Sequence, residues 1–306
     1  MEAIIAENVT KKFKSSILGK KITALKNVSF QLDEHEHLAV MGPSPSGKTT
    51  LLKTIAGIYL PDEGDIRVYG KSVRRKTEEV RKITYYITPQ IQLNKKLTVK
   101  ENLKYFTKVA GRELTEEIIQ LLETAEINDE VMDKRLETLS ETQTITLKLA
   151  IGLIKKPRIL LMDNIFSSLE PKIKETFTET IEKLREEITL IMVDQDMETL
   201  SKLCRKTLIL NHRGEMIMMG SVEQLLKNYP YKYDVEVTLK NSSIKEKIRR
   251  LGYPTQTIGD LMRIYIKSEN EILELTSKLL KMKEHILKFE ISGIDMEDIY
   301  YWIINK

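Results

Sequence analysis

The stretch GPSPSGKTT, residues 42–50, has the residue types and spacing needed to hold a chain of phosphates. It follows the apolar run Leu38–Met41 and precedes a segment with a helical pattern. Small residues in such a loop let backbone N–H groups turn inward on phosphate oxygens at the N-terminus of a helix. Lys48 would reach the β- and γ-phosphates, and the Thr49 hydroxyl would bind Mg²⁺. The predicted nucleotide-binding residues of this loop are Gly42, Pro43, Ser44, Pro45, Ser46, Gly47, Lys48, Thr49 and Thr50.

A second stretch, ILLMDNIFSSLEP (residues 159–171), combines a buried strand pattern with an acidic side chain. Ile159–Met162 predict the strand, and Asp163 would lie at its end, where a carboxylate can hold Mg²⁺ through water. A glycine-rich turn with a surface lysine is the alternative interpretation of residues 42–50, and Asp163 argues against it. Asn164 follows where a second carboxylate would complete a hydrolytic pair. The two stretches together therefore indicate nucleotide binding.

The elements around these stretches alternate between strands and helices. Strands are predicted near residues 1–14, 24–32, 38–41, 64–70, 83–90, 158–163, 188–194 and 207–220, the first as an edge strand and the last as a hairpin. Several are continuously apolar, which is typical of a parallel sheet covered on both faces. Residues 99–155 have a helical pattern that interrupts the alternation, so we predict an inserted helical subdomain at about residues 91–155.

The C-terminal part of the sequence has a different organisation. A composition change at KNYPYKY, residues 227–233, indicates a linker. Beyond it, short strand patterns and a helix over residues 269–283 predict a small α+β domain. The predicted domains are an α/β core of residues 1–226 and an accessory domain of residues 227–306.

Composition excludes several classes of protein. The formal net charge of +4 is too small to indicate nucleic-acid binding, and no basic tract is interleaved with aromatic residues. The single cysteine, Cys204, rules out an internal disulfide and indicates a reducing compartment. No apolar stretch approaches the ~18 residues that cross a bilayer, so any membrane role requires a partner. His35 and His37 suggest a metal site, but a solvated charged turn is the favoured interpretation.

Further elements occur in a fixed order along the chain. They are Phe13, the loop of residues 42–50, Gln90, LSETQ (residues 139–143), the strand ending at Asp163 and SSLEP (residues 167–171). This arrangement resembles the nucleotide-binding subunits of ABC transporters over residues 1–225. The tail, ending KFEISGIDMEDIYYWII, is similar to the C-terminal extension of ABC-2 type export ATPases. The resemblance implies a P-loop NTPase fold that uses ATP and Mg²⁺.

The resemblance also implies roles for residues at matching positions. In the family, two subunits meet head to tail, and each ATP lies between one subunit's phosphate loop and the other's signature loop. Phe13 would stack on adenine, while Ser140 and Gln143 would contact the ATP of the partner. The implied metal ligands are Thr49, Gln90 and Asp163, and Gln90 is also placed in the catalytic site.

The chain departs from the family pattern where hydrolysis takes place. The glutamate that polarises the attacking water is replaced by Asn164, and the histidine that holds the γ-phosphate by Gln195. An amide cannot accept a proton, and loss of a general base typically costs ~10²–10⁴ in rate. Gln195 can still donate a neutral hydrogen bond, which is weaker than a charge-assisted one. Asp194 and Glu170 are imaginable substitute bases, but nothing in the sequence places either beside the water.

Other departures affect phosphate binding and the neighbouring site. Pro45 removes a backbone donor from the loop and fixes φ near −65°. Glu141 and Thr142 replace two glycines of the signature, adding like charge and bulk beside the partner's γ-phosphate. Glu170 replaces an aspartate, and Thr146 stands at a position that is usually arginine. Ordinary drift in a working enzyme is the alternative explanation, and the number of changes at such positions argues against it.

The sequence therefore predicts an ABC-2 type exporter subunit that binds ATP–Mg²⁺ and hydrolyses it poorly. It would lie in the cytoplasm against the inner face of the cell membrane, bound to a transmembrane permease subunit. A homodimer would lack the base in both sites, which favours a heterodimer with a more complete ATP-binding subunit. Two alternatives stay open: an active homodimeric transport ATPase that uses another water-orienting group, and a scaffold that binds no nucleotide. Whether the chain is an enzyme is not decided by the sequence.

Overall fold

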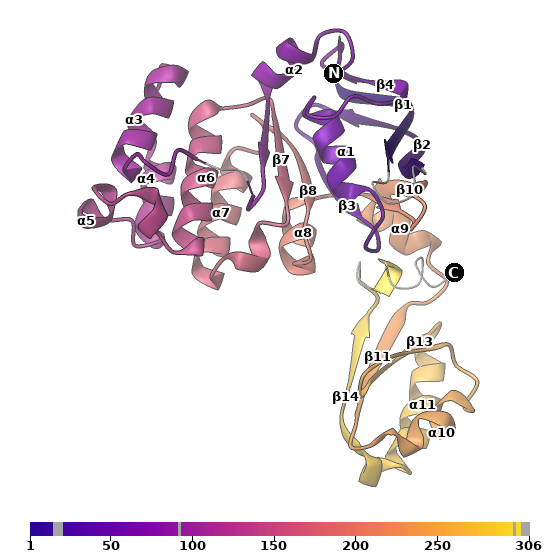
Figure 1. The fold of residues 1–306 in the computed structure, drawn as a ribbon. Helices are drawn as coiled ribbons and strands as arrows, with labels where there is room; N and C mark the ends of the chain where they lie inside the picture. The colour runs from indigo at the N-terminus through magenta and orange to yellow at the C-terminus, as the bar shows by residue number, and fades with distance from the viewer. Residues whose placement is uncertain (15–20, 91–92, 296–297, 301–306) are drawn as a thin grey trace. The chain divides into compact units, whose positions relative to one another are not determined.

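A computed structural model of the chain describes residues 1–14, 21–90, 93–295 and 298–300 (Figure 1). The chain divides into two compact units, Met1–Ser221 and Val222–Lys306. The predicted boundary after residue 226 falls inside helix α9 (Val222–Asn228), all of which belongs to the second unit. Within the described ranges, no helix is both long and apolar enough to span a bilayer.

A six-stranded sheet forms the centre of the first unit. Its strand order is β10-β9-β3-β8-β7-β6, and neighbouring strands are parallel except for the antiparallel β9–β10 hairpin. The strands are β3 (His37–Met41), β6 (Thr84–Ile87), β7 (Ile159–Asp163), β8 (Thr189–Val193), β9 (Lys206–Leu210) and β10 (Met216–Ser221). Strands β3, β7 and β8 are buried along their whole length. The continuous apolar runs therefore predicted the central strands correctly.

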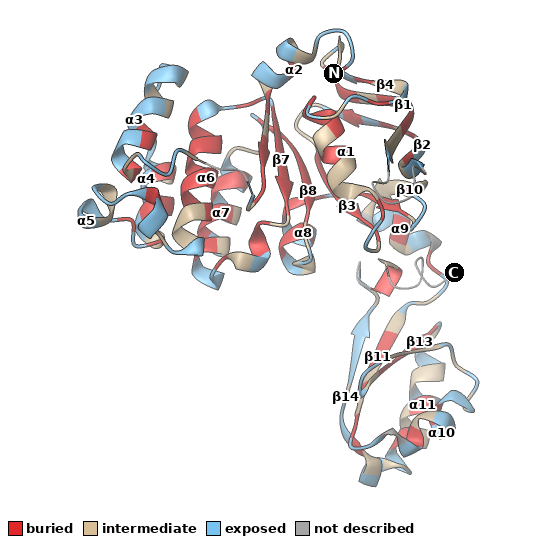
Figure 2. Cartoon of the chain, in the orientation of Figure 1, coloured by how far each residue is buried: buried red, intermediate tan, exposed pale blue. Residues whose placement is uncertain are grey.

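Each face of this sheet packs against a different layer, so its central strands β3, β7 and β8 are buried in Figure 2. Because side chains alternate along a strand, Leu160 of β7 joins one core and Leu161 joins the other. The first core also contains α3, α4, α6 and α7, and the second contains α1 and an antiparallel sheet. The helices are α1 (Lys48–Ile55), α2 (Thr77–Ile83), α3 (Val99–Ala110), α4 (Glu116–Thr124), α5 (Asp129–Met132), α6 (Glu141–Lys155), α7 (Pro171–Lys183) and α8 (Met197–Leu203). The predicted α/β core with a sheet covered on both faces is confirmed.

The antiparallel sheet has the order β2-β1-β4-β5. Its strands are β1 (Glu2–Lys14), β2 (Lys21–Asp33), β4 (Glu63–Val68) and β5 (Lys71–Ser72). Strand β1 pairs with β2 on one side and with β4 on the other. The prediction that residues 1–14 form an edge strand is therefore wrong, because the pattern of one strand does not show which distant strand pairs with it.

The helical subdomain is present as predicted, between β6 and β7. Helix α3 begins with a capping box formed by Thr98 and Glu101, and it ends at Gly111 in the left-handed conformation. Buried residues of α3 and α4 pack against α6 in the first core. Helix α6, the longest of this group, runs from just after Ser140 to the turn before β7. It therefore connects the signature segment to the strand that carries Asp163.

His37 lies in this core and not in a solvated turn, which corrects the sequence interpretation. It opens β3, is 1% exposed, and its Nδ1 lies 3.0 Å from the Leu203 carbonyl oxygen. Burial lowers the pKa of His37 to about 4. His35 belongs to the turn before β3 and has a positive φ of 62°. The two histidines therefore have different environments and do not form a metal site.

The second unit is a small α+β structure, as predicted. Its antiparallel sheet has the order β12-β13-β11-β14. The elements are β11 (Tyr233–Leu239), α10 (Lys245–Arg249), β12 (Thr255–Ile258), β13 (Leu261–Ile266), α11 (Glu269–Leu280) and β14 (Ile286–Gly293). Residues of α10 and α11 join the strands in one hydrophobic core. Residues 301–306, which include most of the YYWII segment, lie outside the described residues.

Candidate functional site

The loop of residues 42–47 connects the end of β3 to the beginning of α1, in the place that the sequence predicts. Gly42 and Gly47 have φ values of 155° and 87°. A Cβ on Gly47 would lie 2.1 Å from the Ala24 carbonyl oxygen, so only glycine fits there. Because Gly47 has no side chain, the cap of α1 provides no acceptor for the first N–H groups of the helix. These N–H groups can therefore bind an anion.

Lys48 holds its ammonium group against this loop. Its Nζ donates to the carbonyl oxygens of Gly42 at 2.7 Å and Pro43 at 3.0 Å. Burial lowers the pKa of Lys48, and the charge of Asp163 acts in the opposite direction. Ser44 and Pro45 are exposed at the tip of the loop. The loop thus combines helix N–H groups with a positive charge, which is the chemistry that phosphate groups require.

Asp163 lies at the carboxyl end of β7 and is 3% exposed. Its Oδ1 accepts a hydrogen bond from the Thr49 hydroxyl at 3.1 Å, and its Oδ2 accepts one from the Tyr86 hydroxyl at 2.7 Å. Hydroxyl and carboxylate oxygens are the ligands that Mg²⁺ prefers. Across the described residues, no group of three His, Cys, Asp or Glu side chains could hold a metal. The Thr49–Asp163 pair fits an Mg²⁺ ion whose other ligands are phosphate and water.

Asn164 follows Asp163 in the left-handed conformation, with φ of 53°. Its backbone N–H donates to the Val193 carbonyl oxygen at 2.7 Å. Its side-chain amide donates to Asp163 Oδ1 at 2.9 Å. Asparagine adopts this conformation more readily than most residues do. The side chain next to the Asp163 carboxylate is therefore a neutral hydrogen-bond donor.

Tyr86 was missed by the sequence analysis. It lies within the short strand β6, is 7% exposed, and packs in the second core. Burial raises the pKa of its hydroxyl, and the hydrogen bond to Asp163 raises it further. A buried tyrosine hydroxyl usually has a hydrogen-bond partner. A tyrosine in a strand predicted to be buried was therefore a usable signal, although it could not identify Asp163 as the partner.

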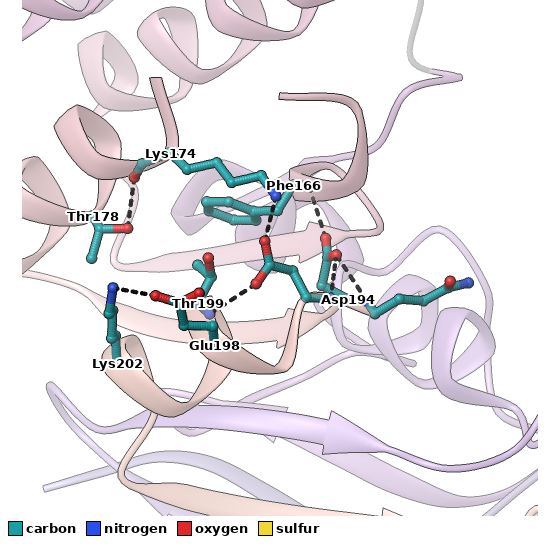
Figure 3. A network of polar contacts seen from close by, with 9 residues as sticks. Phe166, Lys174, Thr178, Asp194, Glu198, Thr199 and Lys202 are labelled. Carbon is teal, nitrogen blue, oxygen red and sulfur yellow. Dashed lines mark hydrogen bonds and ion pairs between the residues drawn. The ribbon is translucent and has the colours of Figure 1, made fainter. Parts of the chain in front are cut away.

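The segment after β8 carries Gln195, which is exposed. Asp194 accepts hydrogen bonds from three backbone N–H groups: Phe166 at 2.9 Å, Gln195 at 2.8 Å and Asp196 at 3.1 Å. Figure 3 shows how these contacts tie the segment after β8 to the segment after β7. Asp194 is thus engaged in holding the backbone. Its carboxylate is poorly suited to serve as a substitute base.

Lys174 of α7 extends this network on its other side (Figure 3). Its Nζ pairs with Asp196 Oδ2 at 2.5 Å, and Asp196 Oδ1 caps α8 by accepting from the Thr199 N–H at 3.0 Å. Burial opposes ionisation of Asp196, but Lys174 and the cap hold the pKa of Asp196 below its usual value. The segment that carries Gln195 is therefore anchored at Asp194 and at Asp196.

The remaining predicted residues lie on three other segments. Gln90 is exposed, and its Oε1 accepts a hydrogen bond from the Thr88 hydroxyl. Phe13 is half-buried, and its ring meets that of Tyr59 edge-on at 5.3 Å between centroids. Thr50 lies in the first turn of α1. Within the described residues, no hydrogen bond joins Gln90 to Asp163 directly.

Ser140 and Gln143 form the capping box of α6. The Gln143 N–H donates to Ser140 Oγ at 3.1 Å, and the Ser140 N–H donates to Gln143 Oε1 at 3.2 Å. Glu141 accepts from the Ser168 hydroxyl at 3.0 Å, and Thr142 donates to the Ser168 carbonyl oxygen at 3.3 Å. The signature segment is thus bound to the turn after β7. In the described contacts of one chain, it is not bonded to the phosphate loop.

The comparisons with known proteins agree with this geometry. A family model described as ABC transporter matches residues 25–167. The methionine import ATP-binding protein MetN of Chlamydia felis is 30% identical over 75% of this chain and 73% of its own length. The chain belongs to the ABC transporter family. Its similarity to ATP-binding proteins and to a solved ABC cassette confirms the predicted cassette fold.

Other ABC transporter proteins extend the comparison to both units. The linearmycin resistance ATP-binding protein LnrL of Bacillus subtilis is 27% identical over 96% of both chains. ABC transporter A family member 8 of Dictyostelium discoideum is 29% identical over 94% of this chain, which spans 36% of that relative's length. The cassette MJ0796, solved as a dimer bound to ADP and Pi, has 26% identity and a TM-score of 0.62. That alignment covers 71% of this chain and 98% of the cassette.

Proposed function

We propose that this chain is the ATP-binding subunit of an ABC-2 type membrane exporter, and that it binds ATP–Mg²⁺ but hydrolyses it slowly. The environment of Asp163 carries this proposal. Thr49 and Asp163 provide hard oxygen ligands, and Lys48 lies in the adjoining phosphate loop. The next side chain, Asn164, is a neutral amide that donates to Asp163. An amide cannot take a proton from the attacking water.

The residues around the site favour slow hydrolysis over efficient hydrolysis that uses an alternative base. Asp194 follows the neighbouring strand β8, and its two carboxylate oxygens already accept hydrogen bonds from three backbone N–H groups. Gln195 offers a neutral donor in place of a cation, which weakens stabilisation of the γ-phosphate. Each of these features lowers the rate without removing the groups that bind ATP.

The proposed partner subunits follow from the family and from the departures at Asn164 and Gln195. ABC cassettes work as dimers with transmembrane subunits, and the solved cassette MJ0796 is a dimer. We place this chain on the cytoplasmic face of the membrane beside a permease subunit, paired with a more complete ATP-binding subunit that supplies a base. LnrL, a resistance protein by its name, matches this chain over both units, which supports the exporter branch. Phe13 would then contact adenine, and Ser140 and Gln143 the partner's ATP.

Two measurements on the purified chain test the proposal. A fluorescent ATP analogue is titrated in the presence of Mg²⁺, and phosphate release is measured at saturating ATP. We expect saturable binding that is lost in Lys48→Ala, and release at least ~10²-fold slower than in a family member with the glutamate. Release at the rate of an intact member would establish the active homodimer instead. Absence of binding in the unmodified chain would establish the scaffold.

A further inference from the structure

The hydrogen bond between Tyr86 and Asp163 joins two neighbouring strands at the metal side of the site. Strands β6 and β7 are parallel, and Tyr86 pairs in register with Leu161, two residues before Asp163. The donor and acceptor oxygens are 2.7 Å apart, and both residues are almost fully buried. A bond from a hydroxyl to a carboxylate is charge-assisted, and it is strengthened where water is excluded.

This bond holds the oxygen of Asp163 that does not face Thr49. The two carboxylate oxygens are chemically equivalent, so a donor on one side is needed to fix their orientation. Tyr86 binds Oδ2, and Thr49 and Asn164 both donate to Oδ1. In the described part of the chain, Tyr86 is the hydrogen-bond donor to Oδ2. Without it, a buried carboxylate oxygen would lose its protein partner, and only the two donors on Oδ1 would hold the side chain.

We propose that Tyr86 is a positioning residue that holds the Asp163 carboxylate in place for Mg²⁺. This inference rests on the proposed function, because it requires that the site binds a nucleotide with Mg²⁺. Hydrogen-bond partners behind a metal-binding group typically change metal affinity by ~10–100-fold when they are removed. Asp163 holds the metal through water, so we expect an effect at the lower end, about 10-fold.

The test is the Mg²⁺ concentration that gives half-maximal binding of a fluorescent ATP analogue. Tyr86→Phe removes the hydroxyl and keeps the ring in the core. The matched control is Tyr85→Phe on the same strand, whose ring packs against the first core and lies 4.8 Å from Lys155 Nζ. We expect Tyr86→Phe to raise the Mg²⁺ midpoint about 10-fold, and Tyr85→Phe to leave it unchanged. Binding of the analogue in EDTA should be similar in all three proteins. Tyr86→Phe should also lower the melting temperature of the free chain, because a hydrogen bond to a buried carboxylate is lost.

The outcomes separate this inference from the function on which it rests. An unchanged midpoint in Tyr86→Phe, or an equal rise in Tyr85→Phe, overturns the positioning role while leaving ATP binding intact. A loss of binding in EDTA that matches the loss in Mg²⁺ also overturns it, because it shows that the hydroxyl only supports packing. Failure of the unmodified chain to bind the analogue at any Mg²⁺ concentration refutes the proposed function and this inference together.

Discussion

Replacing Asn164 by glutamate places a carboxylate at the position where, under the proposed function, a neutral amide slows hydrolysis. Gain of a general base typically changes the rate by ~10²–10⁴. Gln195 and the bulky signature residues Glu141 and Thr142 would still weaken the composite sites. We therefore expect phosphate release to increase by about 10², the lower end of that range. Asn164→Gln is the matched control, because glutamine has the length of glutamate and cannot accept a proton.

Asn164→Glu should also lower the free energy of unfolding, for two structural reasons. Asn164 has φ of 53°, and a side chain that does not favour the left-handed region costs about 1–2 kcal/mol there. Loss of the 2.9 Å bond from the amide to the Asp163 carboxylate costs about 1.5–3 kcal/mol. The new carboxylate would also repel Asp163 until Mg²⁺ binds between phosphate and protein. The glutamate variant should consequently melt at a lower temperature than the unmodified chain, and Mg²⁺ with nucleotide should recover part of the difference.

The assay compares phosphate release by the unmodified chain, Asn164→Glu and Asn164→Gln at saturating ATP and Mg²⁺, well below the melting temperature of each. Only the glutamate variant should be faster. Equal rates in the glutamate and glutamine variants would show that the amide is not what limits hydrolysis. In that case another group orients the water, and the explanation based on Asn164 is wrong.

Three further predictions concern stability. Gly64→Ala should lower the free energy of unfolding by more than Gly70→Ala, for which we expect a loss of ~1 kcal/mol. Both glycines have φ of 73°. An added Cβ at Gly64 would lie 2.2 Å from the Glu7 carbonyl oxygen of β1, whereas a Cβ at Gly70 would have no neighbour within 4 Å. Burial lowers the pKa of His37 from 6.5 to about 4. The stability that its neutral form provides is therefore complete above pH 6.5 and is lost as pH falls toward 4. His37→Asn should reduce this change in the free energy of unfolding between pH 6.5 and pH 4. Burial and, to a smaller extent, the charge of Asp298 raise the pKa of Asp234 from 3.8 to about 7. The stability that the neutral carboxyl provides is therefore complete below pH 3.8 and is lost as pH rises through 7. Asp234→Asn should stabilise the second unit at pH 8 and have little effect at pH 4.

Urea unfolding followed by circular dichroism measures all three. Equal losses in the two glycine variants would contradict the steric argument at Gly64. An acid-induced loss of stability between pH 6.5 and 4 that is as large in His37→Asn as in the unmodified chain would contradict the role of His37. For the second unit, a stabilisation by Asp234→Asn that is the same at pH 4 and pH 8 would show that ionisation of Asp234 is not responsible.

Several features of the site could be predicted because they depend on residues close together in sequence. The glycine and lysine spacing of residues 42–50 predicts the phosphate loop from the backbone freedom of glycine and the geometry of a helix N-terminus. The apolar run before Asp163 predicts a buried strand that ends in a carboxylate. The helical pattern of residues 99–155 predicts the inserted subdomain. In each case, local periodicity and local chemistry contain the information.

The phosphate loop, the strand ending at Asp163 and the neutral side chain of Asn164 could thus be predicted from the amino-acid sequence. Three features became known from the folded chain: β1 lies inside its sheet, His37 is buried, and Tyr86 donates to Asp163 across 77 positions of the chain. These features could not be predicted because strand pairing and the partners of buried polar groups depend on contacts between distant segments. Such contacts form only when the whole core packs, and no periodicity along the chain encodes them.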